Sequence, residues 1–291
     1  MPVVIVDDKE WFYEIIGEGA PCIIVGIASC YLHALPARLK KVFRFICCDF
    51  NWTNANLPLS RITTLTMRDM ILLYEQLRKA LGLSKIFMMG HSRPAWLAHA
   101  YASAFPEHTL GVLMLHPPAI WIGNESARSW HAENYFKQRA SVERQRLRYK
   151  NRQQLIIKTP RNAMQSFVAS YLADAPFYWA DPYFDASFFW HGPCINFPLF
   201  AYYSDNMLAQ YAKRMPQENL TIKNKLLIIL GAMDYSIPVV DWQSALCPID
   251  PKCIKIAENS GHYVLKEQQA WAEYTILSWK MSLKEHHEKC R

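Results

Sequence analysis

The sequence lacks any long apolar run. No stretch of 18 consecutive apolar residues occurs, and the longest candidate, residues 21–36, is interrupted by Gly26, Ser29 and His33. We therefore expect no membrane-spanning helix. The first residues, MPVVIVDDKEW, contain no basic region followed by an apolar core, so no export signal is predicted. These absences favour a cytoplasmic location.

The eight cysteines form no CxxC pair and no spacing typical of a metal site. Without an export signal they are expected to be reduced and mostly buried, with a Cys247–Cys253 pair as the alternative. No HExxH or comparable cluster occurs, and the turn VGIASCY holds one glycine where a dinucleotide-binding fold needs several. A metal-dependent hydrolase and a Rossmann-type oxidoreductase are therefore unsupported, and we predict neither a metal nor a cofactor.

The chain has 291 residues, of which 51% are hydrophobic and 20% charged, so it can form one large domain or a core with an insertion. Its net charge of +7 is concentrated in a basic segment, residues 137–161, which holds nine Lys or Arg and one acid, Glu143. This segment is either a solvated helix face or a contact for an anionic surface. Only Tyr149 interleaves with its charges, so no nucleic-acid partner is expected.

Short apolar runs alternate with helical segments at both ends of the chain. The runs read as buried strands at 22–27, 43–50, 85–90, 111–118, 224–234 and 252–264, and helices are predicted at 63–83, 94–105 and 266–286. This alternation predicts an α/β fold, with a mostly parallel sheet covered by helices on both faces.

Residues 119–220 follow a different pattern. They begin with the basic segment and become strongly aromatic at 176–203. We interpret them as an inserted, mostly helical cap whose aromatic face covers an apolar site, which is compatible with a simple packed subdomain. The predicted core then consists of residues 1–118 and 221–291. Phe189 and Trp190, within the aromatic run, are candidates for lining a substrate pocket.

Three chemically useful side chains follow predicted strands. Ser92 follows KIFMMGH, Asp234 follows LLIILGAM and His262 follows CIKIAENSG. A serine hydroxyl becomes a nucleophile when a histidine accepts its proton and a carboxylate orients that histidine. The carboxyl ends of parallel strands meet at one edge of a sheet, so these three residues are expected to lie together.

Alternatives remain for the acid and the histidine. Asp205 or Asp241 could replace Asp234 as the acid, and Asp234 could instead cap a turn. His116 also ends a strand, but Pro117 and Pro118 follow it, so a structural role is predicted.

The order Ser, Asp, His and the motifs around it resemble the α/β-hydrolase superfamily, in the capped branch with esterases and proline iminopeptidases. The stretches that carry the resemblance are YEIIGEGAPCIIVGI, MGHSRPAWLAHAYASAFPEHTLGVLMLHPP, LLIILGAMDYSIP and ENSGHYVLKEQQAW, whereas the cap matches no specific pattern. By this resemblance Ser92 is the nucleophile, His262 the general base and then acid, and Asp234 the orienting carboxylate.

The resemblance also implies an oxyanion hole made by the backbone N–H groups of Ile27 and Arg93, with Gly26 and His91 supporting the pocket. The family commonly has His-Gly before the oxyanion residue, and here the pair is Val25-Gly26. The glycine that permits close backbone approach is therefore retained.

Pro94 is the sharper departure, because the family has glycine two residues after the serine. Proline is tolerated in the first turn of a helix, where its missing N–H has no partner, and it leaves the Arg93 N–H in place. Its ring adds bulk where the elbow packs tightly, and it biases Arg93 away from helical geometry. We predict an elbow with altered packing that remains active.

The sequence thus predicts a serine hydrolase that cleaves a carboxylic ester, thioester or small amide with an apolar portion. One alternative is a weak or inactive binding module of the same fold. Another is a proline iminopeptidase-like aminopeptidase, which would need inward-facing cap acids chosen among Glu125, Glu133, Asp174, Asp181, Asp185 and Asp205. Epoxide hydrolases and haloalkane dehalogenases need aspartate at the elbow, which Ser92 excludes.

Overall fold

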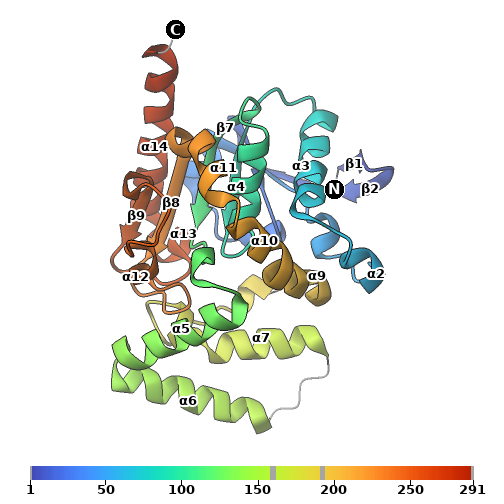
Figure 1. Ribbon diagram of the computed structural model, residues 1–291. Helices are drawn as coiled ribbons and strands as arrows, with labels where there is room; N and C mark the ends of the chain where they lie inside the picture. Colours follow the sequence, from blue (N-terminus) through green and yellow to red (C-terminus); the bar gives the residue numbers. More distant parts are fainter. Residues whose placement is uncertain (1, 158–161, 191–193, 290–291) are drawn as a thin grey trace.

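The computed structural model describes residues 2–157, 162–190 and 194–289. Within them, a seven-stranded sheet is flanked by helices (Figure 1). The strands are β1 (Val3–Val6), β2 (Lys9–Phe12), β3 (Glu14–Ile16), β4 (Ala20–Ile24), β5 (Phe43–Cys47), β6 (Ile86–His91), β7 (Thr109–Leu115), β8 (Leu226–Gly231) and β9 (Ile254–Ala257). The sheet order is β3-β5-β4-β6-β7-β8-β9, while β1 and β2 form a separate antiparallel hairpin. Strand β3 runs antiparallel to β5, and the other neighbours in the sheet are parallel.

The helices fill the connections between strands. The α-helices are α1 (Ala37–Val42), α2 (Leu59–Ile62), α3 (Met67–Ala80), α4 (Ala95–Ala104), α5 (Glu125–Arg139), α6 (Val142–Ile157), α7 (Ala163–Ala173), α8 (Ala175–Tyr178), α9 (Phe197–Tyr202), α10 (Leu208–Ala212), α11 (Met215–Ile222), α12 (Val239–Trp242), α13 (Val264–Glu267) and α14 (Gln269–Lys289). The short 3-10 helices are η1 (Ala28–Tyr31), η2 (Phe50–Trp52), η3 (Ile120–Ile122), η4 (Ser187–Trp190), η6 (Lys223–Lys225) and η7 (Pro251–Cys253), and η5 (Tyr203–Met207) is a π-helix.

The sheet is buried on both faces. Along β6, Ile86 and Met88 enter one hydrophobic core while Phe87 and Met89 enter the other. Successive side chains of a strand point to opposite faces, so a strand covered on both sides is apolar throughout. This explains why β6 and β8 read as continuous apolar runs in the sequence.

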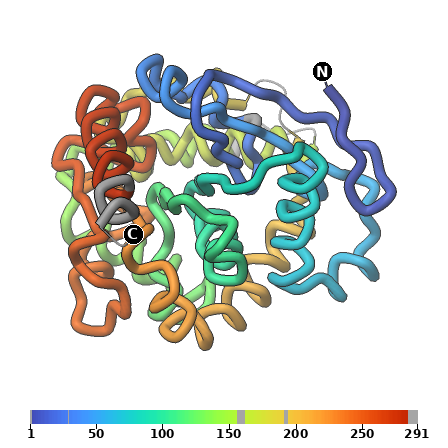
Figure 2. The backbone as a smooth tube through the Cα atoms, turned by 90° about the horizontal axis from the view of Figure 1, so that it is seen from above, coloured from blue at the N-terminus to red at the C-terminus, as the bar shows by residue number. Residues whose placement is uncertain are grey.

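Different helices cover the two faces. Helices α3, α4 and α11 pack with one core, and α1 and α14 close the other. Helix α3 begins with a capping box, in which the Thr66 hydroxyl accepts from the Asp69 N–H and the Asp69 carboxylate accepts from the Thr66 N–H. Viewed from above, the N-terminal hairpin of β1 and β2 lies on the side opposite α14 (Figure 2).

The segment between β7 and β8 has two parts. Helices α9, α10 and α11 contribute Leu199, Tyr211 and Ile222 to the main core. Helices α5 to α8 instead form small clusters of their own, around Phe136 and around Trp179, and lie beyond the edge of the sheet (Figure 1).

The predicted α/β class is confirmed, and each predicted strand corresponds to a strand of the sheet. The β1–β2 hairpin was not anticipated from the sequence. The seven described cysteines are free thiols, and burial raises the pKa of several of them, among them Cys30, whose pKa is about 12. No described helix is long and apolar enough to span a bilayer.

Candidate active site

Ser92 occupies a sharp turn between β6 and α4. Its φ of +55° lies in the left-handed region that non-glycine residues rarely adopt. The Ser92 N–H donates to Leu115 O of β7 at 2.8 Å, and the Ala95 N–H donates back to Ser92 O at 3.0 Å. A Cβ on Gly90 would lie 2.6 Å from Ala95 Cα, so glycine is required where the strand passes under the helix. The turn is therefore strained and held by its neighbours.

Pro94 fits this turn because Gly26 makes room for its ring. Pro94 has φ −59° and ψ −17°, so it continues into the helix without distortion. Gly26 has φ +92°, and a Cβ there would lie 2.6 Å from Pro94 Cβ and 2.8 Å from Pro94 Cγ. The ring thus takes the space beside Gly26 and leaves Ser92 in its strained conformation.

Asp234 and His262 meet in the buried interior. Asp234 follows β8 and His262 follows β9, and His262 Nδ1 lies 2.5 Å from Asp234 Oδ2. Because a carboxylate accepts, the proton lies on Nδ1, and Nε2 presents its lone pair away from Asp234. This is the tautomer in which a histidine can accept a proton from a serine.

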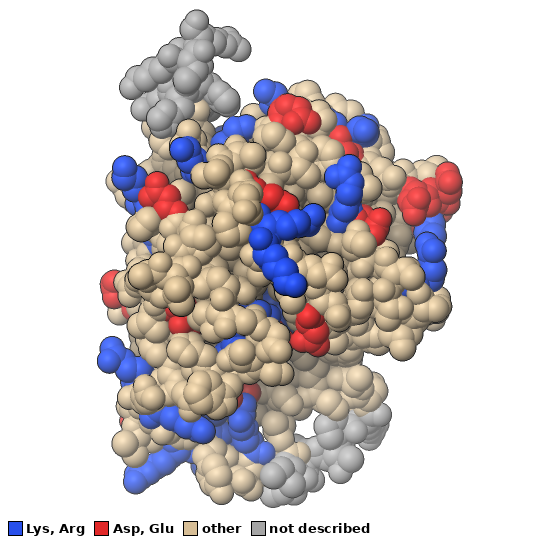
Figure 3. Space-filling model, viewed as in Figure 1, with Lys and Arg blue, Asp and Glu red and all other residues tan. Residues whose placement is uncertain are grey.

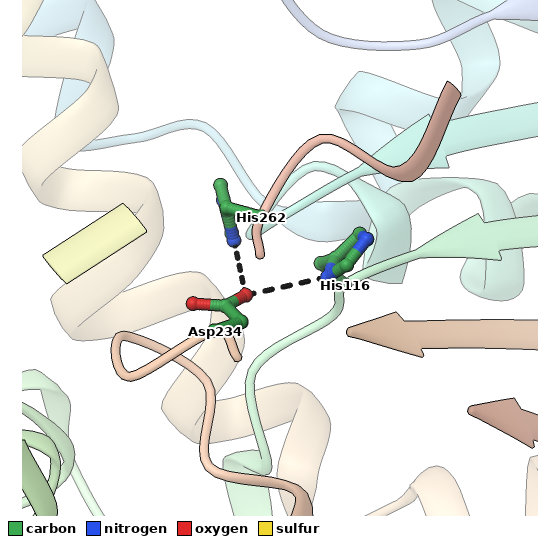
Figure 4. Close-up of side chains that lie close together, drawn as sticks. All are labelled: His116, Asp234 and His262. Carbon is green, nitrogen blue, oxygen red and sulfur yellow. Dashed lines mark hydrogen bonds and ion pairs between the residues drawn. The ribbon is translucent and has the colours of Figure 1, made fainter. Parts of the chain in front are cut away.

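Asp234 is held by a complete set of donors. Its Oδ1 accepts from the Ser236 hydroxyl at 2.6 Å, the Ser236 N–H at 2.9 Å and the Ile237 N–H at 3.1 Å. Its Oδ2 faces both His262 and His116, with His116 Nδ1 at 3.3 Å (Figure 4). Burial alone would raise the pKa of Asp234, but the two histidines outweigh burial and hold the pKa below its usual range.

His116 lies in the buried interior beside Asp234. Its side chain is fully buried, its φ is +47°, and burial lowers its pKa. Neither ring nitrogen of His116 has a hydrogen-bond partner within the described ranges. Among those residues, the one carboxylate at ion-pair distance from His116 is that of Asp234.

His91 supports the loop that carries His262. His91 Nε2 lies 2.7 Å from the backbone oxygen of His262, and its Nδ1 lies 2.6 Å from the Tyr31 hydroxyl. Burial lowers the pKa of His91 well below its usual range, so the ring is neutral. A carbonyl accepts only, which places the proton on Nε2 and makes Tyr31 the donor to Nδ1.

Helix α8 and the loops that carry Asp234 and His262 are joined through their backbones. The His262 N–H donates to Tyr178 O at 2.6 Å, and the Tyr235 N–H donates to Phe177 O at 3.2 Å. A Cβ on Gly261 would lie 2.1 Å from Tyr178 O, so glycine is required before His262. Helix α8 therefore fixes the position of the histidine loop.

Ser92 and His262 line one pocket of about 340 Å³. No hydrogen bond joins the Ser92 hydroxyl to His262 among the described residues. Such contacts are often long without substrate and shorten in the complex. Ile27 and Arg93 also line the pocket, as do His91, Phe189 and Trp190. Gly26 does not, because it lies behind Pro94.

Two alternative acids lie elsewhere. Asp205 is exposed on η5, and Asp241 pairs with His131 at 2.7 Å. The aspartate that reaches His262 is Asp234.

The sequence did not suggest that the pocket carries arginine–carboxylate pairs. Arg93 donates to Glu125 at the start of α5, and Arg148 of α6 donates to Glu133 at 2.8 and 2.6 Å and to Asp174 at 2.8 Å. All five side chains line the pocket. Arg148 also lies 3.9 Å from the centre of the Phe177 ring. The hydrophobic positions of these helices could not reveal which charges face inward.

A metal fits this site poorly. His116, Asp234 and His262 place one ligand atom each within 4.8 Å of one another. A metal on His262 Nδ1 would replace the proton shared with Asp234, and Asp234 already has donors on both oxygens. Asp234 and His262 Nδ1 are therefore already satisfied by hydrogen bonds, which leaves His116 as the one member of the set without a hydrogen-bond partner among the described residues.

Comparisons with known proteins concern the sequence and the fold as a whole. No family model matches the chain. The "AB hydrolase superfamily protein YclE" of Bacillus subtilis is 24% identical over 276 residues, covering 94% of this chain and 96% of that protein. Among solved structures, proline iminopeptidase of Mycobacterium smegmatis aligns with a TM-score of 0.64 at 15% identity, covering 100% of this chain and 99% of that one.

The enol-lactonase of Burkholderia xenovorans LB400 aligns with a TM-score of 0.59 at 18% identity, covering 96% of this chain and 99% of that one. These structural likenesses show the fold, and the similarity to YclE extends along nearly the whole sequence. The chain has the α/β-hydrolase fold, and its sequence is similar to that of an α/β-hydrolase superfamily protein over most of its length.

Proposed function

We propose that the protein is a serine hydrolase that cleaves a carboxylic ester or thioester through an acyl-enzyme on Ser92. The observation that carries this proposal is the hydrogen bond between His262 Nδ1 and Asp234, because it turns Nε2 of His262 toward the pocket that Ser92 lines. Metal and cofactor chemistry have no part in the proposal.

In the proposed reaction, His262 Nε2 accepts the Ser92 proton as Oγ attacks the ester carbonyl. The N–H groups of Ile27 and Arg93 stabilise the oxyanion of the tetrahedral intermediate, and each such donor contributes roughly 10²–10³ in rate. The imidazolium then gives its proton to the leaving alcohol, which leaves the acyl group on Ser92. Water, activated by His262, releases the acid and restores the serine.

We propose that residues 119–220 act as the cap, with α5 to α8 covering Ser92. Aromatic side chains line that side of the pocket, among them Tyr171, Tyr178, Phe189 and Trp190. Burial raises the pKa of Tyr178 to about 12, so its hydroxyl stays protonated at neutral pH. An apolar acyl or alcohol group suits such walls.

The charges of the pocket argue against an aminopeptidase. A substrate ammonium needs an available carboxylate, and Glu125, Glu133 and Asp174 are the cap acids that line the pocket. Each of them is bound by two arginines. Burial alone would raise the pKa of Glu125, but Arg93 and Arg128 outweigh it and lower the pKa, so this carboxylate is ionised and paired.

The test is hydrolysis of 4-nitrophenyl acetate, butyrate and hexanoate beside proline 4-nitroanilide. We expect ester hydrolysis that Ser92→Ala abolishes, with the proline amide untouched. Proline release would favour the aminopeptidase. If none of the substrates is hydrolysed, the result favours the alternative of an inactive binding module.

The basic segment supports a binding module less than its composition suggests. Arg144 is buried and donates to the carbonyls of Pro176, Trp179 and Ala180, and Arg148 is buried in the pocket network. The remaining described cations are Lys137, Arg139, Arg146, Lys150 and Arg152, and Figure 3 shows Lys and Arg gathered over the cap. Residues 158–161 lie outside the described chain.

We therefore propose at most a weak contact between this cap face and an anionic surface. Sedimentation with vesicles of 30 mol% anionic lipid should show binding that disappears above 0.3 M salt. Salt-resistant binding would contradict this picture.

A further inference from the structure

Arg93, Glu125 and Arg128 form a charged cluster beside the nucleophile. Arg93 donates Nε to Glu125 Oε2 at 3.2 Å and Nη2 to Oε1, while Arg128 donates Nη2 to Oε2 at 2.9 Å. All three side chains line the pocket that contains Ser92. Two guanidiniums thus share one carboxylate, so the cluster carries a surplus positive charge.

The surplus positive charge matters because the side chains of the cluster are largely buried. The Arg128 side chain is 8% exposed, and that of Glu125 is 23% exposed. The Arg128 Nε is fully buried and has no hydrogen-bond partner among the described residues. Two guanidiniums that share a single carboxylate in a partly buried site are incompletely neutralised, and a substrate anion in the pocket would offset that cost.

The other charged cluster of the pocket lacks this property. Arg148 and Arg152 face Glu133 and Asp174, so two positive charges meet two negative charges. Among the described residues that line the pocket, the net charge therefore comes from the cluster next to Ser92. Arg93 follows Ser92 directly in the chain, and its side chain is 33% exposed.

We propose that the substrate carries a carboxylate, which binds the surplus charge of Arg93 and Arg128 while Ser92 attacks the ester. This inference rests on the proposed function and adds the charge class of its substrate. The carboxylate accepts hydrogen bonds from the guanidiniums, and the ester carbonyl turns to Ile27 and Arg93 N–H. Charge-assisted hydrogen bonds of this kind are the stronger ones in partly buried sites.

The test compares esters that differ by one charged group. In the first series the charged group is on the acyl part: methyl hexanoate, monomethyl adipate and methyl 6-aminohexanoate. In the second series it is on the alcohol part: hexyl acetate and 6-acetoxyhexanoate. Acid release is followed in a pH-stat at pH 7.5. We expect the carboxylate ester to exceed its neutral counterpart about tenfold in kcat/KM in at least one series, which corresponds to ~1.4 kcal/mol. The amino ester should be the poorest substrate, and the preference should shrink as salt is added.

Variants of α5 locate the effect. Arg128→Gln should reduce the carboxylate-to-neutral ratio toward one, Arg128→Lys should retain most of it, and Glu125→Gln should increase it. Arg139→Gln removes the same charge from an exposed position of the same helix and should leave the ratio unchanged. The ratio is measured within each variant, so partial unfolding lowers both rates and cancels.

A ratio at or below one in both series, or a preference for the amino ester, overturns the inference. In that case hydrolysis of the neutral esters by Ser92 still supports the proposed function. Loss of all ester hydrolysis, with Ser92 unreactive, contradicts the proposed function itself. An unchanged ratio in Arg128→Gln would also overturn the inference, because it would place the anion elsewhere.

Discussion

Gly26 and Pro94 form one packing unit that holds the loop of Gly26 against the turn of Ser92. The informative perturbation is Gly26→Ala, alone and combined with Pro94→Gly. An added Cβ would lie 2.6 Å from Pro94 Cβ, whereas carbon atoms in ordinary contact are about 3.5–4.0 Å apart. The loop and the turn must therefore separate by about 1 Å.

The expected loss of rate follows from this displacement. A misplacement of about 1 Å costs roughly 10²-fold in rate, or ~2.7 kcal/mol of transition-state stabilisation. Alanine at φ +92° adds backbone strain of about 1–3 kcal/mol, which lowers the free energy of unfolding. We expect Gly26→Ala to lower kcat/KM about 100-fold. Pro94→Gly alone should change kcat/KM by no more than a few-fold and lower stability by about 1 kcal/mol.

The double variant separates the two causes. Pro94→Gly removes the ring that the new Cβ would meet, so Gly26→Ala with Pro94→Gly should recover at least tenfold of the lost rate, while the backbone strain remains. The kinetics of 4-nitrophenyl butyrate hydrolysis and the thermal unfolding are measured for the wild type, both single variants and the double variant, which form a double-mutant cycle. Wild-type activity in Gly26→Ala, or no recovery in the double variant, would refute the packing argument. Higher activity in Pro94→Gly than in the wild type would show that the ring hinders the site.

Three further predictions concern buried charges. His116→Phe removes one of the two histidines that face Asp234 Oδ2, so kcat/KM should fall as the carboxylate orients His262 less firmly, and an unchanged kcat/KM would make His116 purely structural. Arg148→Met leaves two carboxylates without their buried partner and should lower the free energy of unfolding by about 2 kcal/mol in urea titrations, whereas Arg146→Met, exposed on the same helix, should cost under about 0.5 kcal/mol.

The third prediction concerns the buried carboxylate of Glu75. Burial alone would raise its pKa, but its hydrogen bonds from Arg78 and Tyr101 lower the pKa to about 2. A carboxyl whose folded pKa is depressed adds stability above its unfolded pKa, and that stability is lost as pH falls from about 4.5 to 2. Glu75→Gln should therefore remove part of the stability difference between pH 7 and pH 3 in urea titrations, and an unchanged difference would contradict the assignment.

The main strands of the sheet, and the polar residues that follow them, could be predicted because both faces of the sheet are buried. Such strands are apolar throughout, as in 226–231, and polar residues that follow them stand out. Ser92, Asp234 and His262 stood out in this way. The β1–β2 hairpin was missed because burial alternates along β1 but polarity does not: Ile5, like Phe12 of β2, is apolar and exposed.

The interior of the pocket could not be predicted from the sequence. The basic segment looks uniform, yet Arg144 and Arg148 point inward while Arg146 is exposed. Which arginine faces a carboxylate depends on how α5, α6 and α8 pack, and this is decided by tertiary contacts. The accommodation of Pro94 likewise depends on Gly26, which lies 68 residues away in the chain and close in space.

The measurement that tests the account most directly is intact-mass analysis after treatment with a fluorophosphonate, with the modified residue located by peptide sequencing. The account predicts a single adduct on Ser92, absent from Ser92→Ala, and still on Ser92 in Ser170→Ala, which changes another serine of the same pocket. Failure of both the wild type and Pro94→Gly to react, or modification of a different serine, would contradict the claim that Ser92 is an activated nucleophile.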